Sequence, residues 1–200
     1  MEFDLLGEHQ KSAYKLLAGL VTPRPIAWVT TQDSEGRVNA APFSFFNVFG
    51  SQPPILAFAP GNKTAEIPKD TARNIRRTGE FVVNLVDEAT AEAMNVTAAE
   101  LEFGESEIAH AGLTTLPSEL IAPPRIAESP VAMECKEWAT LEVGRNRLVI
   151  GVVHRLVVRD GVLNPDTLLV NPEAYQPIGR MQAPAAYCRT RDQFNMERPD

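Results

Sequence analysis

Apolar and polar positions alternate most regularly between residues 131 and 143. The odd-numbered positions are apolar except Glu137, and they are Val131, Met133, Cys135, Ala139, Leu141 and Val143. The even-numbered positions include Glu134, Lys136, Thr140 and Glu142. A period of two is typical of a β-strand that buries one face. Gly-Arg-Asn at residues 144–146 then predicts a turn, and residues 148–158 predict a second long strand that returns beside the first.

Shorter apolar runs predict further strands at residues 26–31, 38–41, 55–59 and 80–86, and Asp-Ser-Glu-Gly at residues 33–36 predicts a turn between the first two. Two long strands with several short ones favour a closed antiparallel barrel, which removes exposed sheet edges. A two-sheet sandwich is the alternative.

Three segments predict helices. The first covers about residues 9–20, and the second runs from Asp70 to Thr78, with a start at Asp70 or Thr71 and a stop at Gly79. The third is alanine-rich and covers residues 87 to about 100, with acidic residues in its first turns. Pro-Arg-Pro at residues 23–25 predicts an extended path before the first strand.

Composition narrows the class of protein. The 200 residues are 44% hydrophobic and 22% charged, which is ordinary for a globular chain. The net charge of −7 and the lack of a basic block argue against a nucleic-acid partner. No apolar run reaches the roughly 18–20 residues of a membrane span, and the acidic start does not resemble a signal peptide. With only Cys135 and Cys188, we expect a reducing, cytoplasmic setting.

Residues 39–54 form an aromatic and polar segment, in which four of the nine phenylalanines lie between Phe43 and Phe49. Uncharged polar side chains are interspersed among these rings, at Ser44, Asn47 and Ser51. Such a surface suits a flat heterocycle with apolar faces and a polar edge. A core strand followed by a turn would give the same pattern, and the sequence alone leaves both interpretations open.

Residues 63–74 place a lysine, Lys69, just before a predicted helix start, with Thr71 in its first turn. Free backbone N–H groups, a hydroxyl and an ammonium group together would bind an anion, preferably a phosphate. Ordinary capping with solvated charges is the alternative. Thr30 and Thr31 end the first strong strand and become candidate ligands only if these two segments lie beside them.

Reactive side chains are otherwise sparse. The three histidines form no metal-binding spacing, and the sequence has no C-x-x-C, G-x-S-x-G, P-loop or G-x-G-x-x-G pattern. We therefore expect no metal site and no catalytic side chain.

Several of these segments, taken in order, resemble the flavin reductase-like family of FMN-binding split barrels, which includes the flavoredoxins. The matching stretches are residues 23–31, 39–47, 53–54, 69–74, 79–84, 111–114, 128–131, 134–135 and 148–151. The resemblance implies a single domain over residues 1–200 that is mainly β: a six-stranded antiparallel Greek-key split barrel with peripheral helices.

The resemblance also implies a homodimer with FMN near the subunit interface. Carried over by position, the FMN-binding residues would be Thr30, Thr31, Asn39, Ala41, Pro42, Phe43, Ser44, Phe45, Asn47, Lys69, Thr71, Asn74 and Arg180. The implied activity is NAD(P)H-dependent flavin reduction, with NAD(P)H or a redox protein as partner. A flavoredoxin-type electron carrier and a non-catalytic FMN-storage or sensing module are the alternatives.

Two stretches depart from the family pattern. Reductase members often carry Gly-Asp-His at the long hairpin turn, where this chain has Gly-Arg-Asn, so an ionisable partner for nicotinamide is missing. The late Arg-Leu-Gly-Gly stretch followed by tyrosine corresponds to residues 180–187, in which the glycines are lost.

Overall fold

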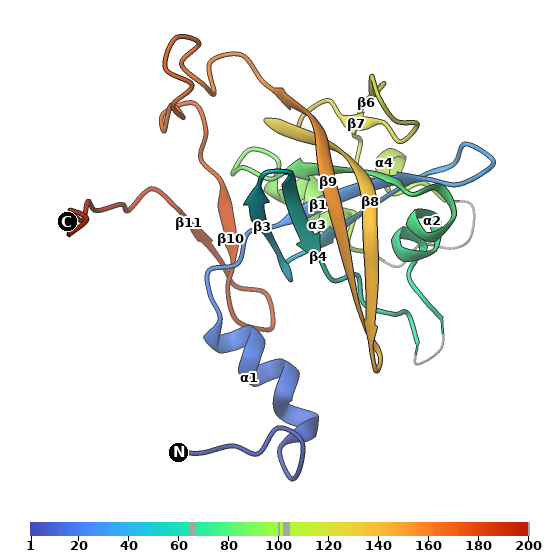
Figure 1. Cartoon of the computed structure of the whole chain (residues 1–200), viewed down its shortest axis with the longest axis vertical. Coiled ribbons are helices and arrows are strands. Elements are labelled where there is room, and N and C mark those ends of the chain that lie inside the picture. Colours follow the sequence, from blue (N-terminus) through green and yellow to red (C-terminus); the bar gives the residue numbers. More distant parts are fainter. Residues whose placement is uncertain (65–66, 100, 102–104, 200) are drawn as a thin grey trace.

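A computed structural model describes residues 1–64, 67–99, 101 and 105–199 of the chain. Its main element is an antiparallel sheet of seven strands in the order β2-β1-β5-β8-β9-β4-β3 (Figure 1). The strands are β1 (Ala27–Gln32), β2 (Val38–Phe43), β3 (Phe46–Ser51), β4 (Pro54–Phe58), β5 (Glu80–Leu85), β8 (Val131–Val143) and β9 (Asn146–Val158). Two small hairpins pair β6 (Thr115–Leu116) with β7 (Arg125–Ile126), and β10 (Ile178–Arg180) with β11 (Tyr187–Arg189).

A bend at Ser44 and Phe45 turns the sheet into a split barrel. β2 and β3 lie at opposite ends of the strand order, although only these two residues separate them in sequence. Within the described residues no ladder joins β2 to β3, so the two edges are linked through the chain itself. The predicted barrel is confirmed. It has seven strands rather than six because the bend divides one long strand into β2 and β3.

The barrel interior is apolar. Its buried cluster comprises Ala27, Val29, Phe43, Phe46, Leu56, Phe58, Ile75, Phe81, Val83, Met133, Cys135 and Val149. Phe58 packs against both Phe43 and Phe81, with ring centroids 5.4 Å apart in each pair. Gly151 leaves room for this cluster, since a Cβ there would lie 2.4 Å from Cζ of Phe81.

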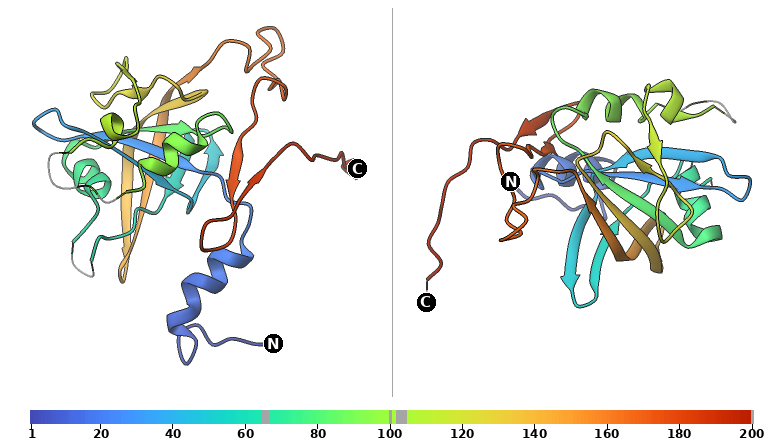
Figure 2. Two further views of the ribbon diagram at one scale, coloured as in Figure 1. Left: turned by 180° about the vertical axis from the view of Figure 1, so that it is seen from behind. Right: turned by 90° about the horizontal axis from the view of Figure 1, so that it is seen from above.

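Helices cover the barrel from outside. α2 (Asp70–Thr78) packs on β1, β2 and β5 and inserts Ile75 into the barrel core. α3 (Ala91–Val96) and α4 (Glu107–His110) belong to a second apolar layer around Trp28, whose indole N–H donates to Thr97 Oγ1 at 2.8 Å. Figure 2 shows η1 (Gln10–Ser12) and α1 (Ala13–Leu20) extending away from the barrel, as does the segment after β11.

The third predicted helix is shorter than its alanine content suggested. Residues 87–90 instead form a turn, in which the buried Asp87 carboxylate accepts from the Thr90 N–H at 3.1 Å and from its hydroxyl at 2.9 Å. Local side-chain hydrogen bonds of this kind compete with helix formation. Residue 100, the predicted end of that helix, lies outside the described residues.

Strand β8 does not bury one face along its whole length. Val131, Met133 and Cys135 are buried as predicted, but Leu141 and Val143 are 51% and 71% exposed. β5 pairs with β8 only as far as Lys136, and β4 pairs with β9 only from Val149 to Val152. Beyond Thr140, which lies opposite Val149, β8 and β9 therefore form a two-stranded ribbon. Glu134, expected on the polar face, is fully buried because its carboxylate accepts the N–H groups of Glu119 and Leu120.

Candidate functional site

Helix α2 opens with unused backbone donors. Lys69 is extended, with ψ of 155°, and the first intrahelical bond runs from Arg73 N–H to the Lys69 carbonyl at 3.0 Å. The N–H groups of Asp70, Thr71 and Ala72 precede that bond and have no backbone acceptor among the described residues. Such a helix start attracts an anion.

The predicted helix start at Asp70 and stop at Gly79 are confirmed. The capping alternative is wrong for Asp70, because Lys69 occupies the N-cap position and makes no side-chain capping bond. The Asp70 carboxylate is held elsewhere, since it pairs with Lys63 Nζ at 2.6 Å and with the Arg73 guanidinium. The Asp70 carboxylate therefore does not cap the backbone N–H groups at the start of α2.

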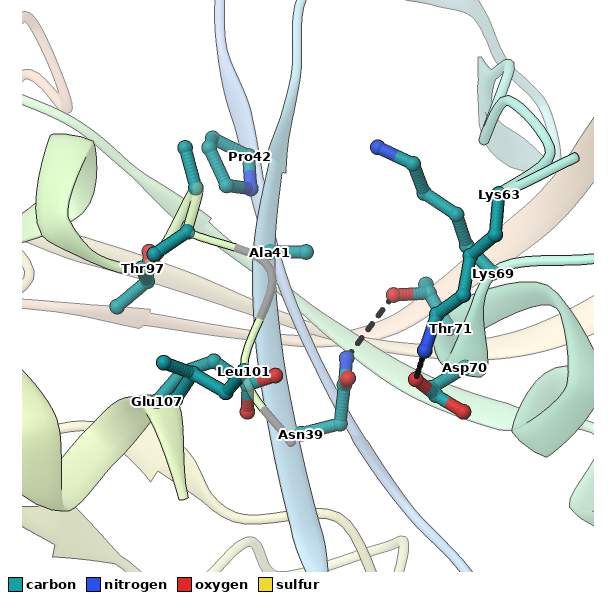
Figure 3. Close-up of a pocket in the computed structure, with 12 residues that line it drawn as sticks. Asn39, Ala41, Pro42, Lys63, Lys69, Asp70, Thr71, Thr97, Leu101 and Glu107 are labelled. Carbon is teal, nitrogen blue, oxygen red and sulfur yellow. Dashed lines mark hydrogen bonds and ion pairs between the residues drawn. The ribbon is translucent and has the colours of Figure 1, made fainter. Parts of the chain in front are cut away.

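Two ammonium groups lie at this helix start. Lys63 is fixed by Asp70, while Lys69 Nζ lies 5.7 Å from the ring centroid of Phe43 and makes no ion pair within the described part of the chain. Figure 3 shows the Lys69 side chain extending across the pocket toward Pro42. Lys69 is thus the cation at this helix start that is not committed to an acidic side chain.

Asn39, Thr71 and Asn74 line the pocket with neutral polar groups. Asn39 Nδ2 donates to Thr71 Oγ1 at 3.0 Å (Figure 3), and Asn74 Nδ2 donates to Thr31 Oγ1 at 3.1 Å. Asn74 is only 3% exposed, yet its Oδ1 has no donor among the described residues. Buried polar atoms are nearly always paired, so this atom suits a ligand hydroxyl or N–H.

Glu107 forms the opposite wall. It begins α4, and its carboxylate accepts from the Ala40 N–H at 3.4 Å. Burial raises the pKa of the Glu107 carboxyl above its usual range. Backbone hydrogen bonds from Glu107 and Ala40 oppose this rise, as does the Lys63 charge, while the Asp70 charge adds to it. Ala98, Ala99 and Leu101 complete this side of the pocket.

Most of the sequence-predicted residues meet at this site. Asn39, Ala41, Pro42, Lys69, Thr71 and Asn74 line the pocket. Thr31 is buried behind Asn74, and Phe43 lies beneath the Lys69 ammonium.

Five predicted residues lie elsewhere in the described structure and do not line this pocket: Thr30, Ser44, Phe45, Asn47 and Arg180. Thr30 faces the other side of β1 from Thr31, because successive strand residues alternate, and it donates to the Pro124 carbonyl at 2.6 Å. Asn47 is exposed on β3, beyond the bend.

Ser44 and Phe45 belong to a separate corner organised by the buried Arg24. Its guanidinium donates to the carbonyls of Val21 at 2.7 Å and Met181 at 3.1 Å, to Ser44 Oγ at 3.4 Å, and lies 5.7 Å from the Phe45 ring centroid. Arg180 stacks over Tyr187 at 4.7 Å. The segment 39–47, predicted as one ligand surface, is thus divided by the bend.

Sequence reasoning assigned no ligand-binding role to Lys63, Asp70, Thr97 or Glu107, all of which line the pocket. Lys63 and Asp70 lie in the segment that predicted a helix start, so their charges could have marked them as members of the same site. Glu107 comes from a distant segment with no motif, and only the fold brings it to Ala40. The turn at residues 144–146 is not among the pocket-lining residues, although Arg147 next to it bonds Asn62 at 3.3 Å.

The arrangement fits a ligand that ends in one phosphate and carries hydroxyl groups. Backbone N–H groups, Lys69 and Thr71 suit phosphate oxygens, while Asn39 and Asn74 suit a hydroxyl-bearing chain. Among the described residues there is no group of three or more His, Cys, Asp or Glu placed to hold a metal ion. None of the described helices has the length and hydropathy needed to cross a bilayer.

Comparisons with known proteins show which family and which solved structures the chain resembles. The family model described as "Flavin reductase like domain" matches residues 19–179. The structure of 2-nitrobenzoate 2-nitroreductase from Pseudomonas fluorescens is 36% identical, covering 100% of this chain and 96% of that one, with a TM-score of 0.89. Nitrilotriacetate monooxygenase component B from Bacillus cereus is 35% identical, covering 98% of both chains, with a TM-score of 0.92.

A third solved structure supports the fold assignment alone. It is a flavin reductase with a split barrel domain from Shewanella frigidimarina, 20% identical with a TM-score of 0.84, and the match covers 100% of each chain.

Proposed function

The chain belongs to the flavin reductase-like family, and we propose that it is an FMN-binding oxidoreductase that takes electrons from NAD(P)H. The observation that carries this proposal is the anion site at the start of α2, beside the buried Asn74 Oδ1, which has no hydrogen-bond partner among the described residues. Because the family is one of flavin-binding proteins, a ligand with one phosphate and a ribityl chain is the natural occupant of that pocket.

The chain's own residues bind and orient the cofactor in this proposal. The α2 N–H groups, Lys69 and Thr71 hold the phosphate, and Asn39 and Asn74 hold the ribityl hydroxyls. Ala41, Pro42 and Phe43 give an uncharged surface at the strand side. The bound flavin supplies the electron-transfer chemistry, which accounts for the lack of a catalytic motif in the sequence.

We propose FMN rather than FAD because the described pocket offers one helix start for phosphate binding. FAD therefore gains no compensating contact from its additional phosphate.

The active form in this proposal is a homodimer. Apolar side chains exposed on β3 and on the β8–β9 ribbon support it, among them Val48, Phe49, Leu141 and Val143. Exposed apolar clusters of this kind are typical of interfaces. Sedimentation at micromolar concentration should show a dimer, and Phe49→Glu should shift it toward the 22.0 kDa monomer. A wild-type monomer with flavin bound would refute the dimer.

Flavin titration of the apo-protein, followed by anaerobic NADH or NADPH addition, tests the function. We expect FMN to bind more tightly than FAD and its visible absorbance to bleach when the nicotinamide is added. Tighter FAD binding would refute the cofactor assignment, and no bleaching with either nicotinamide would refute the reductase assignment.

The electron-carrier alternative is favoured by one observation, which is that the turn at residues 144–146 carries no histidine and does not line the pocket. A carrier would bind FMN, resist direct reduction by NAD(P)H and accept electrons from a protein donor.

If bleaching does occur, adding a nitroaromatic acceptor to the reduced protein tests whether the chain shares the activity named for its Pseudomonas relative.

A further inference from the structure

Glu107 is a half-buried carboxyl group inside the pocket, and the flavin-binding proposal gives it no role. Ser106 caps α4 by accepting from Ala109, and α4 packs on β2, so the Glu107 side chain is directed over the edge of that strand. Figure 3 shows it across the pocket from Asn39, Thr71 and Asp70. Its charge interacts with those of Asp70 and Lys63.

The charges that face Glu107 come from four segments. Lys63 precedes α2, and Lys69, Asp70 and Arg73 lie at its start. Asp33 and Arg37 lie on the β1–β2 connection, and they pair with each other at 2.7 Å. On its own segment, Glu107 has Glu105 before it and the exposed His110 at the other end of α4.

Asp70 and Glu107 differ in how their negative charge is compensated. Asp70 is paired with both Lys63 and Arg73. Glu107 makes no ion pair within the described residues; its carboxylate is compensated by backbone N–H groups, its own and that of Ala40, and the Ala40 bond is long at 3.4 Å. When a phosphate dianion enters, Glu107 is therefore the carboxylate that the added charge disfavours most.

We propose that Glu107 takes up a proton when a phosphate-bearing ligand binds at the start of α2, so that affinity for the ligand is linked to pH. The inference rests on the proposed function, because it takes the ligand's phosphate to lie at that helix start. Once protonated, the carboxyl group also gains an O–H that can donate to a phosphate oxygen. Lys69 supplies positive charge that attracts the phosphate, whereas Glu107 would change the pH range over which the ligand binds tightly.

The sign of the pH dependence follows from linkage. The complex binds a proton at Glu107 that the free protein has partly lost, so affinity falls as pH rises between the pKa of the free state and that of the complex. Each unit of separation between these two pKa values changes the affinity about tenfold. The ligand phosphate, with its own second pKa near about 6, changes affinity in the opposite direction, so the effect is measured as a difference between variants.

Isothermal calorimetry of FMN binding, in pairs of buffers with different ionisation enthalpies between about pH 6 and 8, tests the inference. Wild type should take up a proton, and Glu107→Gln should lose that uptake and bind FMN about tenfold more tightly at the upper pH. Glu92→Gln, on the exposed face of α3, is the matched control and should behave as wild type. Riboflavin, which lacks the phosphate, should bind with no Glu107-dependent uptake.

The outcomes separate the two proposals. If FMN binds and its proton uptake is the same in wild type and Glu107→Gln, the inference is wrong while the proposed function stands. If the uptake depends on Glu107 with riboflavin as well, the group responds to the flavin and not to its phosphate, which also overturns the inference. Failure of FMN to bind wild type at all overturns both.

Discussion

The barrel interior and the pocket at the start of α2 share strands but differ in how their side chains are held. Asn39, Ala41 and Phe43 share one face of β2: Phe43 belongs to the interior cluster, Ala41 packs against that cluster and also lines the pocket, and Asn39 lines the pocket. The interior contains no charged group among its buried members, and its rings pack directly on one another. The pocket combines the charges of Lys63, Lys69, Asp70 and Glu107 with an unpaired amide oxygen.

This difference separates stability from binding. Packed apolar side chains contribute to folding through area removed from water and through close contact. Half-buried charges and unpaired polar atoms contribute little to the free energy of folding, or oppose it. They are expected where a bound ligand supplies the missing hydrogen bonds or the opposite charge. Substitutions in the two regions should therefore affect different measurements.

The largest expected effect is on stability, from Phe58→Ala in the interior. Phe58 is fully buried between Phe43 and Phe81, so truncation leaves a cavity and should lower the free energy of unfolding by about 3–5 kcal/mol. Urea denaturation measures this, and flavin affinity of the folded fraction should change little. A loss of affinity equal to the loss of stability would show that the two regions are not separable.

The next effect is on binding, from Lys69→Ala combined with Thr71→Val. The loss of a charge-assisted hydrogen bond is worth about 1.5–3 kcal/mol, or roughly one to two decades in FMN affinity. Fluorescence titration gives the affinity, and Lys15→Ala on α1 is the control for loss of a surface lysine. Unchanged affinity would mean that the α2 start is only a helix terminus.

The sequence predicted these two regions unequally. Strands β1, β4, β5, β8 and β9 followed from runs of apolar residues, because burial in a sheet requires them. The position of the bend at Ser44 and Phe45 could not be predicted, since a strand that changes direction carries the same apolar residues as a straight one. Its consequence is that Phe45 and Asn47 lie apart from Asn39 and Ala41.

The helix start at α2 was predictable because the residues that we propose to bind the phosphate lie close together in sequence. Glu107 was not, since its position depends on α4 packing against β2 across a long sequence separation. Thr30 shows why a shared motif does not place two neighbouring residues in the same site. It is next to Thr31 in the motif, but side chains alternate along a strand, so the Thr30 hydroxyl points away from the pocket and donates to the Pro124 carbonyl.

Asn74 lies between the interior and the pocket, so a substitution there tests whether stability and binding are separate. Asn74→Leu removes the unpaired Oδ1 together with the donor to Thr31, so its effects on stability should nearly cancel. In binding it loses a neutral hydrogen bond, worth about 0.5–1.5 kcal/mol. Paired measurements of unfolding and FMN affinity check this. A stability loss without an affinity loss would assign Asn74 to the interior alone.

The smallest expected effect is alkaline destabilisation through Tyr175, which belongs to neither region. Burial raises the pKa of Tyr175 to about 12, and the Asp87 charge adds to this. The folded state therefore favours the neutral phenol, and its stabilising effect is complete below the ordinary pKa of about 10 and lost as pH rises toward the folded value. Urea midpoints between about pH 9 and 11 should fall less steeply in Tyr175→Phe. Identical pH profiles would contradict the assignment.

The central claim is that the start of α2 binds the phosphate of a flavin. The most direct test compares FMN with riboflavin, which differ only in that phosphate, in wild type and in Lys69→Ala/Thr71→Val. The account predicts that wild type binds FMN at least about tenfold more tightly than riboflavin, and that this ratio falls toward one in the variant while riboflavin affinity is unchanged. The same FMN-to-riboflavin ratio in both proteins would contradict it.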